Sequence, residues 1–291
     1  MTEPILVWGG GAIGGTLAAY WARAGIDVLL VDLENDHVTA CRTHGLEITG
    51  PVDEFVARIP AVTPDEVEGS FDRVVLAVKA QHTRTAIEMI RPHLSAEGYV
   101  VSAQNGLNEL SISGVVGERA TVGAFVNFGA DWHGPGKVLF GNRGDVVVGE
   151  IDGTTLDRTK EIHKLLQIFE PDAVLTENIW GYLWGKLAYG AMLFATALNN
   201  DSMADNFADQ HRTKLWIAIG REVMGLATRK GIQPLGFNGF DPIAYLPGAT
   251  DSEAQTSVKE MAEFNRMSAK THSGIWRDLA VRKRKTEVTE Q

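Results

Sequence analysis

Residues 5–32 read ILVWGGGAIGGTLAAYWARAGIDVLLVD and predict a strand, a glycine turn, a helix and a second strand. Residues 5–8 form an uncharged apolar run, as is typical of a strand buried on both faces of a sheet. Helical spacing of apolar residues follows over 17–24, and Gly25 ends the helix. Residues 27–31 predict the next strand. This order is the first unit of a doubly wound α/β fold.

The glycine turn carries a G-x-G-x-x-G pattern at Gly9, Gly11 and Gly14. The first glycine allows a tight turn, the second lets the backbone approach a pyrophosphate, and the third lets the helix pack on the strand. The helix N-terminus offers N–H groups and the positive end of its dipole to a phosphate. We therefore predict cofactor contacts at Gly9, Gly11, Ala12, Ile13 and Gly14. The alternative is a glycine-rich turn that binds nothing.

An acidic residue, Asp32, follows the second strand, about 20 residues after the glycines, which is where a dinucleotide-binding fold holds the ribose 2′-hydroxyl. The motif therefore stands in the strand–turn–helix–strand context that makes it specific. We predict that Asp32 binds the cofactor.

Composition excludes several classes of function. The chain has 291 residues and a net charge of −10, which argues against a nucleic-acid or anionic-membrane surface. Cys41 is the only cysteine, so neither an intrachain disulfide nor a thiolate metal cluster is expected. No histidine spacing indicates a metal site, no signal peptide is evident, and no apolar run reaches the length of a membrane span. We expect a cytoplasmic protein without a metal.

The rest of the chain predicts two domains. Strands and helices alternate to about residue 170, which favours a parallel sheet with helices on both faces, and 138–149 predict two strands that turn at 141–144. Helices then predominate, over about 179–198, 203–230 and 253–284. We predict a Rossmann-type doubly wound α/β domain over 1–171 and an all-α substrate and dimerisation domain over 172–291.

Three polar residues stand where chemistry is expected. Lys79 and Asn105 each follow a predicted strand, at the sheet edge where ligands of doubly wound folds bind. Each alone also fits a solvated lysine or a turn asparagine. Lys186 lies in the apolar stretch WGYLWGKLAYGAMLF, where burial would lower its pKa and make it a usable proton donor. The alternative is that Lys186 extends from the helix to water.

These residues belong to a series of short motifs that resembles the ketopantoate reductase (2-dehydropantoate 2-reductase) family. The motifs are GGGAIGG at 9–15, AVKA at 77–80, QNGL at 104–107, HGPGKV at 133–138, WGKL at 184–187 and KTE at 285–287. Singly most of them are weak, but their order and spacing are specific. The resemblance implies a Rossmann domain, a helical domain and an active site in the cleft between them.

The resemblance also assigns roles. It implies that Lys186 is the general acid that protonates a 2-oxo acid as hydride arrives from nicotinamide. It places the family's cofactor and substrate lysine at Lys79 and its Q-N-G asparagine at Asn105. Glu287 corresponds to the glutamate that binds a substrate hydroxyl or ordered water. Ser273 corresponds most nearly to the serine that meets the substrate carboxylate, although the segment that follows is one residue longer than usual.

The sequence departs from the family pattern at the cofactor and at the substrate. Asp32 and Leu33 stand where NADPH-dependent members usually carry an arginine, so we expect NAD(H) in preference to NADP(H), with NADP(H) as the alternative. Gly190 and Phe194 replace two asparagines, which favours a branched or aryl 2-oxo acid. The family pattern continues beyond the point where this sequence ends, at Gln291, so we expect further residues or a partner subunit to complete the site.

Three functions follow as alternatives. The first is NAD(P)H-dependent reduction of a small-molecule 2-oxo acid to a 2-hydroxy acid. The second is an NAD-dependent dehydrogenase that oxidises a branched or aryl 2-hydroxy acid. The third is a dinucleotide-binding regulator without catalysis. We expect no nucleic-acid partner, because the basic run at 282–285 is short and ends a predicted helix, and we expect a homodimer.

Overall fold

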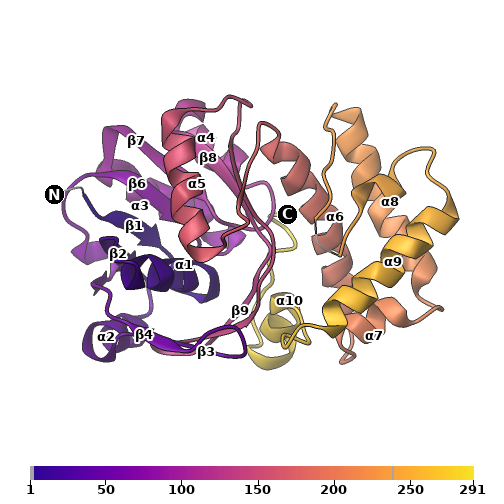
Figure 1. Cartoon of the computed structure of the whole chain (residues 1–291), viewed down its shortest axis with the longest axis horizontal. Coiled ribbons are helices and arrows are strands. Elements are labelled where there is room, and N and C mark those ends of the chain that lie inside the picture. The colour runs from indigo at the N-terminus through magenta and orange to yellow at the C-terminus, as the bar shows by residue number, and fades with distance from the viewer. Residues whose placement is uncertain (1–2, 238) are drawn as a thin grey trace. The chain divides into compact units, whose positions relative to one another are not determined.

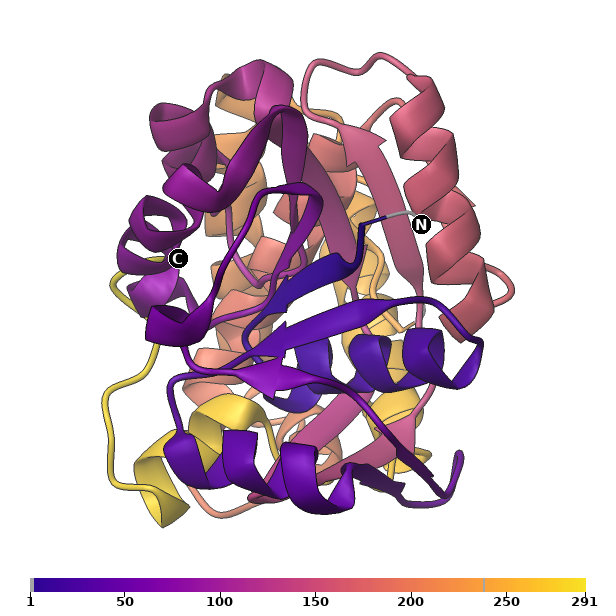
Figure 2. The ribbon, with the colours of Figure 1, turned by 90° about the vertical axis from the view of Figure 1, so that its left-hand side faces the viewer.

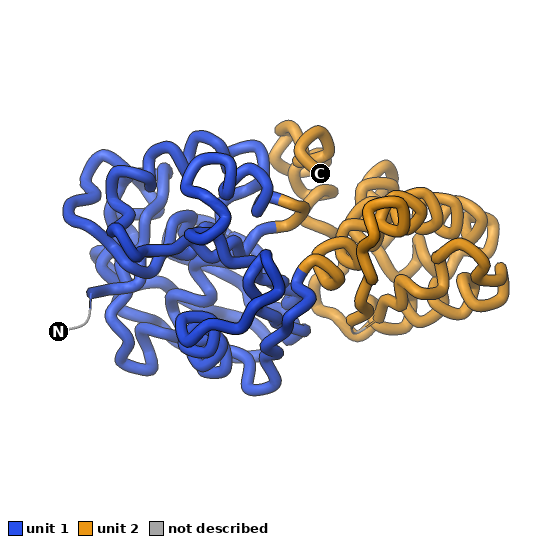
Figure 3. Tube along the Cα trace, turned by 90° about the horizontal axis from the view of Figure 1, so that it is seen from above, with its two compact units in different colours: residues 1–104, 108–179 blue, residues 105–107, 180–291 orange. Residues whose placement is uncertain are grey.

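The computed structural model describes residues 3–237 and 239–291 and divides the chain into two compact units (Figure 3). The first unit comprises Met1–Gln104 and Asn108–Ile179, and the second comprises Asn105–Leu107 and Trp180–Gln291. The boundary expected at residue 172 therefore lies within the first unit. Each unit has a hydrophobic core of its own.

An eight-stranded sheet forms the centre of the first unit (Figures 1 and 2). Its strand order is β12-β11-β8-β7-β6-β1-β2-β5, and every pairing is parallel except that of β8 with β11. The strands, in chain order, are β1 (Ile5–Trp8), β2 (Val28–Val31), β5 (Ala61–Val62), β6 (Phe71–Leu76), β7 (Leu94–Ser102), β8 (Thr121–Val126), β11 (Val146–Glu150) and β12 (Val174–Leu175). The prediction of a doubly wound α/β domain is confirmed.

Alternation along β1 shows how helices cover both faces of this sheet. Ile5 and Val7 lie in one apolar cluster with α1 (Ala12–Arg23) and α5 (Asp157–Phe169). Leu6 and Trp8 lie in a second cluster with α3 (Thr83–Ile90) and α4 (Glu109–Val116). Successive side chains of a strand point to opposite faces, so an apolar run buried throughout requires a cover on each side.

A second sheet of four strands, in the order β4-β3-β10-β9, packs against α1. The strands are β3 (Leu46–Thr49), β4 (Phe55–Ala57), β9 (Gly129–Gly134) and β10 (Lys137–Asn142). β3 and β4 pair antiparallel as a hairpin. Helix α2 (Asn35–His44) precedes this hairpin.

The two strands expected to turn at 141–144 form, but they do not pair with each other. β10 pairs with β9 in the small sheet, whereas β11 pairs with β8 in the large one. The reversal lies instead at Gly134 and Gly136, whose φ values of 137° and 69° are positive. Residues 141–144 connect β10 of the small sheet to β11 of the large sheet.

Helices make up most of the second unit. They are α6 (Ile179–Thr196), α7 (Met203–Ala208), α8 (Thr213–Arg229), α9 (Asp251–Arg266) and α10 (Gly274–Trp276), with a π-helical turn over Arg277–Val281.

Short 3₁₀ turns occur in both units. Those of the first unit lie at Pro64–Glu66, Ala80–His82, Arg91–His93 and Glu118–Ala120, and that of the second lies at Pro242–Tyr245. Among the described residues no helix is both long and apolar enough to span a bilayer.

Two of the three long helices expected in this unit are each broken. Between α7 and α8, the Asp209 carboxylate accepts from the His211 N–H at 2.9 Å, and Arg212 forms ion pairs with Asp201 and Asp209. Such a side-chain turn competes with the helical ladder. After α9, the Ser273 hydroxyl accepts from the Trp276 N–H at 3.1 Å and begins a new short helix.

Candidate functional site

The glycines at the junction of β1 and α1 differ in whether the structure leaves space for a Cβ atom. Gly9 has a φ of 106°, and a Cβ on it would lie 2.9 Å from the carbonyl carbon of Ala77. A Cβ on Gly14 would lie 2.1 Å from the Gly9 carbonyl oxygen, so the start of α1 packs directly on the turn. These two positions are glycine because the protein itself leaves no room.

Gly11 is different, because no heavy atom outside its chain neighbours lies within 4 Å of the Cβ position there, among the described residues. Gly11 is the N-cap of α1, and Ala12 and Ile13 are its first helical residues. The N–H groups of a first helical turn have no partner inside the helix. The turn therefore presents backbone donors beside open space, as a bound phosphate requires.

Asp32 closes one side of this turn. One carboxylate oxygen accepts from the Gly10 N–H at 2.7 Å, and the other accepts from the Glu34 N–H at 3.0 Å. A carboxylate offers about four acceptor positions, so both oxygens can accept further bonds. The sequence predicts Asp32 and the glycines at one site, and in the structure Asp32 bonds to Gly10, which lies between Gly9 and Gly11.

A buried histidine that the sequence analysis missed holds the other side. His37 on α2 is 1 % exposed, and its Nε2 lies 2.9 Å from the Gly10 carbonyl oxygen. Its Nδ1 accepts from the Gly136 N–H at 3.0 Å and from the Trp132 indole N–H at 3.3 Å. Gly136 belongs to the HGPGKV motif, which was the available signal, but nothing in the sequence paired that motif with α2.

Cys41, one turn further along α2, lies 3.8 Å from the His37 Nε2. Burial, with the Asp32 carboxylate as a smaller cause, raises the pKa of the Cys41 thiol to about 11. A thiol that stays protonated near neutral pH is a poor nucleophile and a poor metal ligand. Among the described residues no cluster of histidine, cysteine, aspartate or glutamate could hold a metal ion.

The loops after β6 and β7 are tied together. The Gln104 amide donates to the Val78 carbonyl at 2.7 Å and to the Thr83 hydroxyl at 2.8 Å, and Thr83 donates to the Asn108 side chain at 2.8 Å. Gln104 therefore fixes the segment that carries Lys79.

The predicted residues of these loops differ in exposure. Lys79 is half-buried, whereas Asn105 is exposed and is grouped with the second unit. Their proximity to each other and to a ligand stays a prediction.

Helix α6 carries the predicted general acid. Lys186, Gly190 and Phe194 recur every four residues, so they share one side of the helix, and all three are half-buried. Opposite them, Ala188 and Met192 are fully buried in the core of the second unit. The polar lysine therefore stands at the edge of an otherwise apolar stripe.

The C-terminal segment brings two further predicted residues into the second unit. Ser273 is 4 % exposed and caps α10, so its hydroxyl keeps a proton to donate. Glu287 is 6 % exposed. The segment ends against α6, because the Gln291 amide oxygen would lie 3.7 Å from a Cβ on Gly190.

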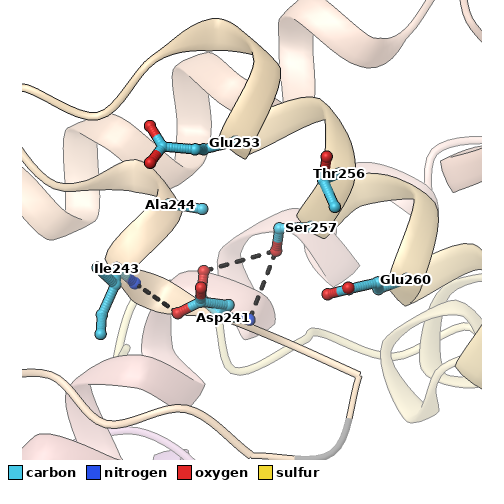
Figure 4. Close-up of a pocket in the computed structure, with 7 residues that line it drawn as sticks. All are labelled: Asp241, Ile243, Ala244, Glu253, Thr256, Ser257 and Glu260. Carbon is cyan, nitrogen blue, oxygen red and sulfur yellow. Dashed lines mark hydrogen bonds between the residues drawn. The ribbon is translucent and has the colours of Figure 1, made fainter.

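A pocket of about 210 Å³ lies elsewhere in the second unit, between the 3₁₀ turn Pro242–Tyr245 and α9 (Figure 4). The Ser257 hydroxyl bonds there to the backbone of Asp241. None of the predicted site residues lines it. Its lining residues include three carboxylates and no cation, which does not suit an organic acid; they are Asp241, Ile243, Ala244, Glu253, Thr256, Ser257 and Glu260.

Comparison with known proteins places the chain among related enzymes. Residues 5–153 match the family model described as ketopantoate reductase PanE/ApbA. A 2-dehydropantoate 2-reductase of Mesorhizobium japonicum is 29% identical over 90% of this chain and 86% of its own length. A relative of the same name from Archaeoglobus fulgidus is 25% identical over 98% of this chain and 87% of its own length.

Solved structures share the fold. A ternary structure of D-mandelate dehydrogenase with NADH and anilino(oxo)acetate has a TM-score of 0.85 at 22% identity, covering 99% of this chain and 89% of that one. A 2-dehydropantoate 2-reductase from Geobacter metallireducens has a TM-score of 0.81 at 21% identity, covering 98% and 90%. The family model spans the glycine turn, Asp32, Lys79 and the Gln104 loop, and this chain therefore belongs to the ketopantoate reductase family, a family of oxidoreductases.

Proposed function

We propose that this protein reduces a 2-oxo acid to a 2-hydroxy acid with NADH. The observation that carries the proposal is the glycine turn, in which Gly11 faces open space while Asp32 bonds to the adjacent Gly10 N–H. Family membership supports the reaction class. When bound, the nicotinamide supplies the hydride, and the residues of the chain bind the substrate, exclude water and deliver the proton.

The cofactor preference follows from charge. Asp32 places a carboxylate where the ribose 2′ position is expected, so it accepts a bond from a free hydroxyl and repels a phosphate. The next residue, Leu33, is 66 % exposed and offers no cation. The D-mandelate dehydrogenase of the same fold is described with NADH. NADP(H) is the less favoured alternative.

Lys186 is the proposed general acid. It is half-buried on an otherwise apolar helix face, and a positioned lysine ammonium can donate a proton to a reacting carbonyl oxygen. We assign it the proton that goes to the carbonyl oxygen as hydride arrives at the carbon. Lys79 and Asn105 would orient the cofactor and substrate, Ser273 would donate to the substrate carboxylate, and Glu287 would accept a substrate hydroxyl or ordered water.

The substrate tail is proposed to be apolar. Gly190 and Phe194 lie on the same face of α6 as Lys186. Neither side chain can donate a hydrogen bond to a substrate tail. Apolar pockets favour aryl or branched tails and discriminate weakly among them. The second candidate function, an NAD-dependent dehydrogenase of an aryl or branched 2-hydroxy acid, rests on this face and on the D-mandelate dehydrogenase fold.

The direct test is NADH consumption by the purified protein with ketopantoate, phenylglyoxylate and a branched 2-oxo acid side by side. We expect phenylglyoxylate or the branched acid to give the higher kcat/KM. Higher kcat/KM for ketopantoate would mean that Gly190 and Phe194 are tolerated replacements. Tight NADH binding without turnover of any 2-oxo acid would instead support a regulator.

Lys186→Ala tests the assignment of the acid. Removing a general acid costs about 10²–10⁴-fold in rate, so we expect kcat to fall by that factor while the Kd for NADH stays within about twofold. Lys259→Ala, on the exposed surface of α9, is the control. Equal losses of kcat and NADH affinity in the Lys186 variant would show that the lysine is structural.

We further propose a homodimer acting in the cytoplasm on a small-molecule acid, with no nucleic-acid or membrane partner. The net charge of −10 supports the last two points. Light scattering of the purified protein, run at several concentrations, measures the oligomeric state, and a monomer at all of them would overturn the dimer.

A further inference from the structure

Gly10, the residue inside the glycine turn, has both of its backbone polar groups bound by side chains. Its N–H donates to Asp32 at 2.7 Å, and its carbonyl oxygen lies 2.9 Å from the His37 Nε2. Gly10 itself is buried. Two side chains from different elements thus fix the peptide units on either side of Gly10, one of which leads directly into Gly11.

The hydrogen-bond partners of His37 determine its tautomer. Its Nδ1 faces two N–H groups, from Gly136 at 3.0 Å and from Trp132 at 3.3 Å, and must accept from both. The proton of a neutral imidazole therefore lies on Nε2, which donates it to the Gly10 carbonyl. The ring spans from the glycine turn to the β9–β10 hairpin.

These hydrogen bonds explain why the polar His37 side chain is buried, although it takes no direct part in the proposed reaction. His37 is 1 % exposed, so it has no room to meet a substrate directly. A Cβ on Gly10 would lie 3.1 Å from the His37 Nε2, so the ring also restricts what residue 10 can be. Its nitrogen and oxygen partners belong to the turn and the hairpin, and the Cys41 thiol on its own helix lies 3.8 Å from Nε2.

We propose that His37 is a positioning residue for the cofactor: it holds the Gly10 carbonyl, and through it the Gly11 backbone, in the orientation that a dinucleotide phosphate requires. The hairpin, through Gly136 and Trp132, holds the histidine. This inference rests on the proposed function insofar as the glycine turn binds a dinucleotide.

Two amide substitutions separate the two sides of the ring. His37→Gln places an amide N–H near the position of Nε2 and keeps the donor to Gly10. His37→Asn places its amide near Nδ1, so it keeps the acceptor for the hairpin and loses the donor to Gly10. Loss of one buried hydrogen bond corresponds to about tenfold in a binding constant. We therefore expect the Kd for NADH, measured by fluorescence titration, to rise about tenfold in Asn and less than threefold in Gln.

His163→Leu is the matched control. His163 lies on α5 of the same unit and also bonds to a backbone carbonyl, that of Ala173, at 2.6 Å. Among the described residues, His163 forms no hydrogen bond with the glycine turn. We expect His163→Leu to lower the melting temperature and leave the Kd for NADH unchanged, which separates loss of stability from loss of positioning.

Nitrogen NMR of the wild-type protein without cofactor gives a second readout, with a protonated Nε2 and an unprotonated Nδ1 expected at His37. Equal NADH affinity in the Asn and Gln variants, or a proton on Nδ1, would overturn the inference and leave the proposed function standing. Absence of NADH and NADPH binding by the wild-type protein would overturn both.

Discussion

Gly11, the N-cap of α1, and Gly14, in its first turn, are expected to respond oppositely to an added methyl group. A Cβ on Gly14 would meet the Gly9 carbonyl oxygen at 2.1 Å, and backbone cannot move away cheaply. We expect Gly14→Ala to destabilise the protein by about 1–3 kcal/mol. Gly11→Ala meets nothing within 4 Å, so we expect its stability to be unchanged or raised by up to about 1 kcal/mol.

For NADH affinity, in contrast to stability, Gly11→Ala is expected to be the damaging substitution. The methyl of Gly11→Ala would occupy the open space that we assign to the pyrophosphate, so the Kd for NADH is expected to rise tenfold or more while the fold is kept. Chemical denaturation and fluorescence titration measure the two quantities. Unaltered NADH affinity in a stable Gly11→Ala protein would show that the pyrophosphate binds elsewhere.

Asp32 combines a structural bond with a charge, and Asp32→Asn separates the two. The asparagine oxygen can still accept from the Gly10 N–H, whereas the negative charge is lost. We expect the Kd for NADH to rise several-fold, since bonds to charged groups are the stronger ones, and the kcat/KM with NADPH to rise about tenfold. Steady-state kinetics with both cofactors checks this.

Asp36→Asn is the control for that experiment, because Asp36 is an exposed acid at the start of α2. It changes the net charge by the same amount. If both variants gained NADPH activity equally, long-range charge and not the contact at Asp32 would set the preference.

At the scale of elements, our proposal assigns the choice of substrate tail to α6. Gly190→Asn would add an amide to the face that carries Lys186, and the site has room, since the nearest atom to the added Cβ is the Gln291 amide oxygen at 3.7 Å. We expect the ratio of kcat/KM for ketopantoate to that for phenylglyoxylate to rise about tenfold, because the new amide can bond the ketopantoate hydroxyl.

Gly225→Asn on α8 is a matched control for this substitution. It is also a helical glycine with free space, its nearest atom being the Arg229 guanidinium at 3.7 Å. Both variants gain similar helix propensity. A substrate ratio unchanged in Gly190→Asn would mean that this face of α6 does not contact the substrate tail.

The elements were predictable to the extent that local pattern decides them. The run from β1 to β2 formed as expected because periodicity, turn glycines and helix end all agree there. The breaks in the helices expected over 203–230 and 253–284 come from side chains that compete for the backbone, such as Asp209. Such side-chain bonds end a helix without interrupting the helical spacing of the apolar residues around them, so the sequence pattern does not show the break.

The same limit applies to the candidate site. Asp32 and the glycines could be predicted together because they lie in one continuous motif, and their role in cofactor binding stays a prediction. His37 was not found, because its partners Gly136 and Trp132 are brought to it by the small sheet, which the sequence did not predict. For Lys79, Asn105, Lys186, Ser273 and Glu287 the assigned roles stay predictions.

At the scale of the whole molecule, buried tyrosines make both units sensitive to alkali. Burial raises the pKa of Tyr99 in the first unit and of Tyr189 in the second to about 12, from the ordinary value of 10.0. The unfolded chain therefore loses these protons first as pH rises. The contribution of each hydroxyl to folded stability is fully present below pH 10 and is lost as pH rises through 12; for Tyr189 it amounts to about 3 kcal/mol.

We expect thermal unfolding at pH 11 to occur at a lower temperature than at pH 8, with each tyrosine acting on its own unit. Tyr189→Phe loses the bond of the hydroxyl to the Asn265 side chain at 3.1 Å, so it should lower stability at pH 8 while reducing the further loss at pH 11. Tyr99→Phe should reduce the alkaline loss of stability in the first unit alone.

Calorimetry measures how the two units unfold. If they unfold in one transition, either variant will shift its temperature; if they unfold separately, there will be two transitions and each variant will shift only one. Equal alkaline losses in the wild type and both variants would show that other groups control the stability at high pH.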